Sequence, residues 1–125
     1  MVTVLIVDDS PSIRLLLVRR LEMAGYSTMT SASGAEAIAA LDEASGGREP
    51  DLILLDAILP DADGPEILDR LKAAGPDIPV LVVSAVTGLA KDKAWTAADG
   101  HVAKPIDFDD LLGRVETLTS GPPRP

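Results

Sequence analysis

The chain contains no cysteine and very few aromatic residues. Without cysteine, disulfide bonds and thiolate metal sites are both excluded. Since there is one phenylalanine, one tryptophan and one tyrosine, the core has to be built from aliphatic side chains. No apolar run approaches membrane-spanning length, and the first residues lack the basic region of a secretory signal peptide. These absences predict a soluble domain, cytoplasmic by default, with no membrane partner.

Basic residues are also in deficit. Lysine and arginine number 11 against 20 aspartates and glutamates, which gives a formal net charge of −9. A chain of this charge has little to release counterions from a phosphate backbone, so we expect no direct binding of nucleic acid. Its 125 residues are the size of one domain. We expect that domain over residues 1–119, followed by a flexible tail rich in proline and glycine over 120–125.

Short apolar runs predict the strands of the domain. Residues 4–7 (VLIV), 52–55 (LILL) and 80–83 (VLVV) are apolar on both faces, which is typical of interior parallel strands covered by helices. Two weaker segments complete the set. The one near residues 26–30 is partly polar and suits a sheet edge, and the one near residues 100–104 is very short. The expected strands lie near residues 3–8, 26–30, 51–56, 80–84 and 100–104.

Helical segments alternate with these strands. Helix starts are indicated by capping residues or proline at Ser10, Ser33, Pro65 and Asp107. The first helix is expected to bury one stripe, made of Ile13, Leu16, Leu17 and Leu21. Alternating strands and helices predict an α/β fold with a parallel sheet, right-handed crossovers and helices on both faces.

Polar residues stand where the aliphatic strands stop. They are Asp8 and Asp9 after the first strand, Asp56 after the third, Ser84 after the fourth and Lys104 after the fifth. In open α/β sheets, ligands bind beyond the carboxyl ends of the strands. We therefore expect these five side chains to face one site.

The chemistry of the five side chains is that of an acyl-phosphate site. Three converging carboxylates repel one another, and Mg²⁺, which prefers oxygen ligands, removes that repulsion. The Asp56 carboxylate can accept a phosphoryl group, whose oxygens Lys104 and Ser84 can contact. Taken singly, each residue has an ordinary interpretation, such as a helix cap, a turn or a solvated charge. Their joint placement favours the site.

In these segments the chain resembles the receiver domain of two-component response regulators, of the chemotaxis-regulator kind. The resemblance covers about residues 2–119. It is carried by residues 4–9 (VLIVDD), 51–56 (DLILLD), 59–64 (LPDADG), 79–85 (PVLVVSA) and 104–105 (KP). It implies a flavodoxin-like, doubly wound, five-stranded parallel sheet with strand order 2-1-3-4-5.

The resemblance also implies roles for the acidic residues. Asp56 matches the acceptor of a phosphoryl group from a sensor histidine kinase or a histidine phosphotransfer protein. Asp9 and Asp56 match direct ligands of Mg²⁺, Asp8 matches an acid that acts through water, and the backbone carbonyl of Ile58 matches a further ligand.

Other matched positions concern the response to phosphorylation. Ser84 matches the hydroxyl residue that follows the phosphoryl group, and Lys104 matches the lysine that pairs with its oxygens, with a cis bond to Pro105. His101 stands at the aromatic switch position. The span between Ser84 and Lys104 is short, so we expect a truncated fourth helix, with Trp95 in this segment filling the core or anchoring a partner.

A phosphorylation-controlled switch is the leading hypothesis. Its output would pass through a downstream effector protein or an output domain outside this chain, and the sequence leaves a homodimer open. No enzymatic activity is expected apart from its own phosphorylation and dephosphorylation. The alternatives are an aspartyl-phosphate phosphatase, which would want an acid where Ile58 stands, an interaction module independent of phosphorylation, and a nucleotide-binding flavodoxin-like domain, which would want a glycine-rich loop after the first strand.

Overall fold

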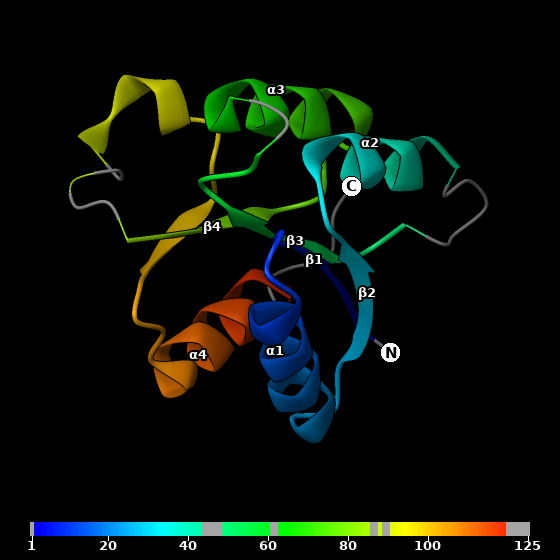
Figure 1. Cartoon of the computed structure of the whole chain (residues 1–125), viewed down its shortest axis with the longest axis vertical. Coiled ribbons are helices and arrows are strands. Elements are labelled where there is room, and N and C mark those ends of the chain that lie inside the picture. The colour runs from blue at the N-terminus through cyan, green and yellow to red at the C-terminus, as the bar shows by residue number, and fades with distance from the viewer. Residues whose placement is uncertain (1, 44–48, 61–62, 86–87, 89–90, 120–125) are drawn as a thin grey trace.

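In the described part of the chain, five parallel strands form one sheet with helices on both faces (Figure 1). The computed structural model describes residues 2–43, 49–60, 63–85, 88 and 91–119. Neighbouring strands pair in the order β2-β1-β3-β4-β5, all of them parallel. The flavodoxin-like sheet and its order are confirmed. The strands are β1 (Thr3–Val7), β2 (Ser27–Ser31), β3 (Leu52–Asp56), β4 (Val80–Ser84) and β5 (Gly100–Ala103).

In the part of the chain that the structure describes, two α-helices cover each face of the sheet. The helices are α1 (Pro11–Met23), α2 (Gly34–Glu43), α3 (Gly64–Ala74) and α4 (Phe108–Thr119). Figure 1 shows α2 and α3 on one face and α1 and α4 on the other. Each layer encloses its own aliphatic cluster, since Leu5 and Val7 of β1 belong to one and Val4 and Ile6 to the other. Because both faces are covered, the middle of each interior strand is apolar, as in residues 4–7, 52–55 and 80–83.

The predicted strand limits differ from the observed ones by about a residue. β1 ends at Val7 and β5 at Ala103, so Asp8 and Lys104 are the first residues beyond their strands. β2 begins at Ser27, because the backbone N–H of Tyr26 donates to the Leu21 carbonyl of α1 and not to the neighbouring strand. The polar ends of the strands are thus placed as expected.

The expected burial of Leu16 is wrong, since this side chain is 43% exposed. Leu17 and Leu21 are buried and Ile13 is half-buried. These three residues are spaced by four, so they form one line along α1 that faces the sheet, and Leu16 lies at its margin. Leu16 instead lines an apolar hollow of about 280 Å³ between α1 and the segment leading into α4.

The described residues of the connection between β4 and β5 include a short 3-10 turn, η2 (Lys93–Trp95), and Lys91 just before it is also in 3-10 conformation. The expected truncation of the fourth helix falls partly on residues 86–87 and 89–90, which lie outside the described residues, so it stays a prediction. Trp95 is 5% exposed and packs in the cluster beneath α2 and α3, which confirms its core-filling role. Its ring lies against Gly64, where an added Cβ would stand 2.5 Å from the ring and 2.5 Å from the Ala57 carbonyl oxygen.

Among the described helices, none has the length and apolarity required to cross a membrane. The expected tail over residues 120–125 lies outside the described residues. The division into a domain over 1–119 and a tail therefore stays a prediction.

Candidate phosphoacceptor and metal site

The carboxyl ends of β1, β3, β4 and β5 meet at one edge of the sheet and form a cleft of about 350 Å³. Asp9, Asp56, Ser84 and Lys104 line it. Its apolar rim is formed by Ile58, Leu59, Pro60 and Ala85. The structure therefore gathers in one cleft residues that lie as far apart as positions 9 and 104.

The three predicted acids lie together. One carboxylate oxygen from each of Asp8, Asp9 and Asp56 lies within 4.8 Å of the others. Asp8 and Asp56 are buried, with 4% and 8% exposure, whereas Asp9 is exposed. The donor set is made of hard oxygens open to solvent on one side, and this arrangement fits Mg²⁺.

The electrostatics of the cluster favour a bound cation. Burial raises the pKa of Asp8 above its ordinary value of 3.8, and repulsion from the Asp56 carboxylate adds to the rise. Two contacts oppose it, the backbone N–H of Ser10, which donates to Asp8 Oδ1 at 2.9 Å, and the charge of Lys104. A divalent cation would favour the ionised form of Asp8, because opposite charge nearby stabilises a carboxylate.

Asp56 ends β3 with both carboxylate oxygens in contact with neighbours. The backbone N–H of Ile58 donates to Oδ1 at 3.1 Å, and Lys104 Nζ lies 3.4 Å from Oδ2. The Lys104–Pro105 bond is cis, as predicted. The backbone N–H of Lys104 donates to the Ser84 carbonyl at 2.9 Å, which ties the end of β5 to the end of β4. Lys104, Ser84 and Asp56 thus each take part in backbone contacts at the strand ends.

His101 lies on β5, three residues before the lysine. Because strand side chains alternate and Val102 packs beneath α1 and α4, His101 faces the other side of the sheet, which carries η2. Among the described residues, no hydrogen-bond partner reaches its buried Nε2. Burial lowers the pKa of His101, and the charge of Arg114 acts in the same direction.

One contact at the site was missed by sequence reasoning. Arg14, in α1, donates from Nη1 to the backbone carbonyl oxygen of Asp8 at 2.7 Å. The available signal was a basic residue one helical turn after the N-cap of the helix that follows the paired acids.

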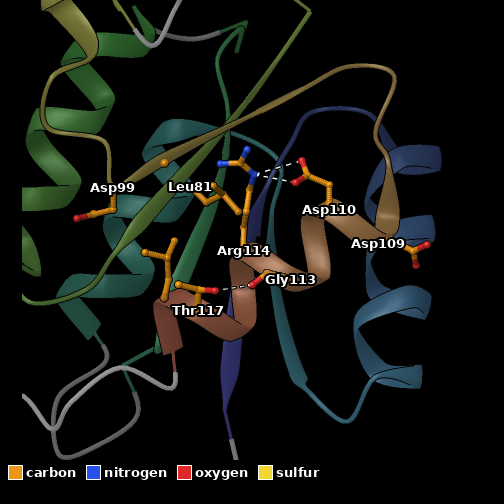
Figure 2. Close-up of a pocket in the computed structure, with 9 residues that line it drawn as sticks. Leu81, Asp99, Asp109, Asp110, Gly113, Arg114 and Thr117 are labelled. Carbon is orange, nitrogen blue, oxygen red and sulfur yellow. Dashed lines mark hydrogen bonds and ion pairs between the residues drawn. The ribbon is translucent and has the colours of Figure 1, made fainter.

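A second hollow, of about 500 Å³, lies between α4 and the neighbouring ends of β4 and β5 (Figure 2). Figure 2 shows Arg114 directed toward Asp110 and the Thr117 hydroxyl donating to the Gly113 carbonyl. Arg114 Nε lies 3.1 Å from Asp110 Oδ1. Among the described residues, this second hollow has no lining residue in common with the acidic cleft. Its charged pair is an ordinary i,i+4 helix contact.

The doubly wound sheet and the acids, hydroxyl and lysine at its carboxyl edge define a class of protein, the phosphoacceptor domains of signalling proteins. The family model for the response regulator receiver domain matches residues 4–116. The chain belongs to the response regulator receiver domain family, whose members are phosphorylation-activated switches of two-component signalling.

Known proteins similar to the chain include response regulators and their receiver domains. Response regulator MprA of Mycobacterium sp. (strain KMS) is 35% identical over 119 residues, which are 94% of this chain and 50% of MprA. The DNA-binding dual master transcriptional regulator RpaA of Synechocystis sp. is 38% identical over 120 residues, 92% of this chain and 48% of RpaA. The chain thus spans about half the length of these curated relatives.

A solved structure gives the same likeness in three dimensions. Response regulator protein TrrA of Thermotoga maritima, in complex with Mg(2+)-BeF, superposes with a TM-score of 0.85 at 33% identity. The match covers 94% of this chain and 99% of TrrA.

Proposed function

We propose that the chain is a switch in which Asp56 accepts a phosphoryl group, with Mg²⁺ as cofactor, from a phosphohistidine of a sensor histidine kinase or a histidine phosphotransfer protein. One observation carries the proposal. Three carboxylates gather within 4.8 Å at the sheet edge, and the ammonium of Lys104 stands 3.4 Å from the acceptor.

The transfer needs little more than positioning and charge. A carboxylate oxygen of Asp56 forms the new bond to phosphorus as the P–N bond of the donor breaks, and the imidazole leaves with that electron pair. Lys104 would pair with phosphoryl oxygens, since it already lies beside the acceptor. The metal, when bound, supplies positive charge against the charge that builds up on those oxygens.

The proposed ligand roles are those that the family resemblance implies, and the placement of the residues supports them. Asp9 and Asp56 line the cleft and would hold the metal directly, with the backbone carbonyl of Ile58 as a further ligand. Asp8 is the most buried of the acids and would act through water. The charge of Asp8 would also make the electrostatic potential in the cleft more negative.

Ser84 and His101 form the proposed response to phosphorylation. The Ser84 hydroxyl lies in the same cleft as Asp56 and would move toward the phosphoryl group. His101, on the neighbouring strand, would then move into the space that Ser84 leaves. A ligand that favours one of two arrangements in this way shifts the population between them.

The kind of downstream effector is inferred from the charge of the chain. The net charge of −9 favours a protein effector over direct contact with nucleic acid, and that effector would be a separate protein or a domain outside this chain. The DNA-binding description belongs to the relative that bears it. We propose a cytoplasmic location, because a histidine kinase would present its phosphohistidine there. We also propose a receiver domain over residues 1–119 with a tail after it. The domain would have no activity beyond its own phosphorylation and dephosphorylation.

Intact mass measurement after incubation with Mg²⁺ and acetyl phosphate tests the proposal. The native chain should gain one phosphoryl group, whereas Asp56→Asn and the native chain with EDTA should gain none. Asp63→Asn, which removes an exposed acid nearby in sequence, is the matched control and should be labelled normally. Label on Asp56→Asn, or none on the native chain, would contradict the proposal, and turnover of an unrelated phosphate ester would favour a phosphatase.

A further inference from the structure

Arg14 makes a contact with the acidic site that the proposed function does not use. Its Nη1 donates to the backbone carbonyl oxygen of Asp8 at 2.7 Å in a partly buried position. Its own backbone N–H continues α1 by donating to the Ser10 carbonyl at 3.0 Å. The side chain therefore folds back from the helix onto the residue that leaves β1.

Asp8 is held at three of its polar groups. Its N–H donates to the Ser31 carbonyl of β2 at 3.1 Å, and its Oδ1 accepts from the N–H of Ser10 at 2.9 Å. The Arg14 contact adds a bond to its carbonyl oxygen. Because a peptide unit is planar, a bond to this carbonyl orients the whole unit that joins Asp8 to Asp9.

Asp9 has no such support of its own. It is exposed, and in the part of the chain that the structure describes no hydrogen bond holds its carboxylate. Yet a carboxylate oxygen of Asp9 lies within 4.8 Å of the other two acids. This closeness therefore depends on the direction in which the backbone presents the Asp9 side chain.

The electrostatics of α1 do not explain an arginine at this place. The positive end of the helix dipole disfavours a cation near the N-terminus, and the first turn of α1 holds no acid that would compensate it. A guanidinium offers several donors in a rigid plane, which suits a fixed bond to one carbonyl better than the single ammonium of lysine does.

We infer that Arg14 is a positioning residue of the metal site. Through the Asp8 carbonyl it keeps the Asp8–Asp9 peptide in the orientation that brings the Asp9 carboxylate to the cluster, and it contacts neither metal nor phosphoryl group. The inference rests on the proposed function, since it assumes that the three acids bind Mg²⁺.

Titration calorimetry with MgCl₂ alone tests this role in the full chain. Arg14→Gln should weaken Mg²⁺ affinity about tenfold, the scale seen when groups that orient metal ligands are removed. Arg14→Lys keeps the charge and should still bind more weakly than the native chain. Arg19→Gln, which removes an equal charge from an exposed position of α1, should change the affinity by less than about twofold.

The sign of the effect separates positioning from charge. If Arg14 acted only as a nearby cation, removing it would strengthen Mg²⁺ binding, and Arg14→Lys would match the native chain. Either result overturns the inference. Phosphorylation of Arg14→Gln by acetyl phosphate should recover at saturating Mg²⁺, because the acceptor itself is intact.

Thermal unfolding in EDTA separates positioning from simple stabilisation. A lower unfolding midpoint for Arg14→Gln with unchanged Mg²⁺ affinity would overturn the inference. If Arg14→Gln does not fold, Arg14→Met, which keeps the apolar stem of the side chain, replaces it. A native chain that fails to bind Mg²⁺ would sink the proposed function as well. Equal binding by the native chain and the Arg14 variants would sink this inference alone.

Discussion

Asp8 is largely withdrawn from solvent, since it is 4% exposed, and its carboxylate lies beside that of Asp56. Burial and that neighbour raise its pKa, so the metal-free fold binds a proton at Asp8 more readily than the unfolded chain does. Stability therefore falls as pH rises from the unfolded value of 3.8 through the higher folded pKa, and the deficit remains at neutral pH.

Asp8→Asn should raise the unfolding midpoint of the metal-free protein at pH 7 by a few degrees. The amide keeps an oxygen for the Ser10 N–H and removes the buried charge. Its advantage should vanish below about pH 3.8, where Asp8 is protonated in both states. Thermal unfolding in EDTA across this range measures the effect, and a destabilised variant at pH 7 would contradict it.

His101 predicts a pH dependence of the opposite sign. Its folded pKa lies below 6.5, so the unfolded chain binds the proton more tightly, and stability is lost as pH falls through 6.5 toward the folded pKa. Relative to His101→Phe, the native chain should lose unfolding free energy across this interval. Urea unfolding of both proteins at several pH values measures this loss. A difference in unfolding free energy that does not change with pH would show that His101 has the same pKa in the folded and unfolded states.

At the scale of elements, the connection from β4 to β5 is the unusual part of the domain. Its described residues include the short 3-10 turn η2, in which Trp95 provides a large side chain for the cluster beneath α2 and α3. The close approach of the ring to Gly64 ties the connection to the start of α3. Through this one aromatic ring the connection takes part in the core beneath α2 and α3.

Trp95→Ala should cost about 3–5 kcal/mol of unfolding free energy, the usual range for removing a buried aromatic ring. The side chain is 5% exposed and contacts the cluster beneath α2 and α3, so the loss leaves a cavity. Trp95→Phe, which fills part of the space, should cost less. Denaturant unfolding followed by circular dichroism measures both, and a cost below that of a surface substitution would mean that the ring is not part of the core.

At the scale of the whole molecule, Mg²⁺ binding is linked to folding. The acids come from the ends of β1 and β3, so the site exists when the sheet is formed. A cation that binds only the folded state stabilises it by mass action. The net charge of −9 adds a general self-repulsion that any salt screens, so specific binding has to be separated from screening.

Mg²⁺ at one hundred times its dissociation constant should stabilise the fold by about 2.7 kcal/mol. The unfolding midpoint should rise with the logarithm of Mg²⁺ concentration and return to its starting value in EDTA. NaCl of equal ionic strength and the variant Asp56→Asn are the controls, and both should give a smaller rise. An equal rise with NaCl would show that screening alone is responsible.

Much of the fold could be predicted because its signals are local. Aliphatic runs such as residues 52–55 identify interior strands, and capping residues such as Ser10 and Asp107 mark where helices start. The acids, Ser84 and Lys104 could be placed at strand ends by the same reasoning. The strand order could not be predicted from such local signals, since right-handed crossovers allow several orders and periodicity does not choose among them. It was implied by the family resemblance.

The sequence by itself therefore determined the class of fold and the chemistry available at the carboxyl edge of the sheet. Tertiary structure alone decided that Leu16 stays exposed, that Trp95 packs on Gly64, and that Arg14 turns back onto the Asp8 carbonyl. The reason is physical. Strand and helix signals act over a few neighbouring residues, whereas these contacts depend on how helices, loops and sheet finally pack against one another.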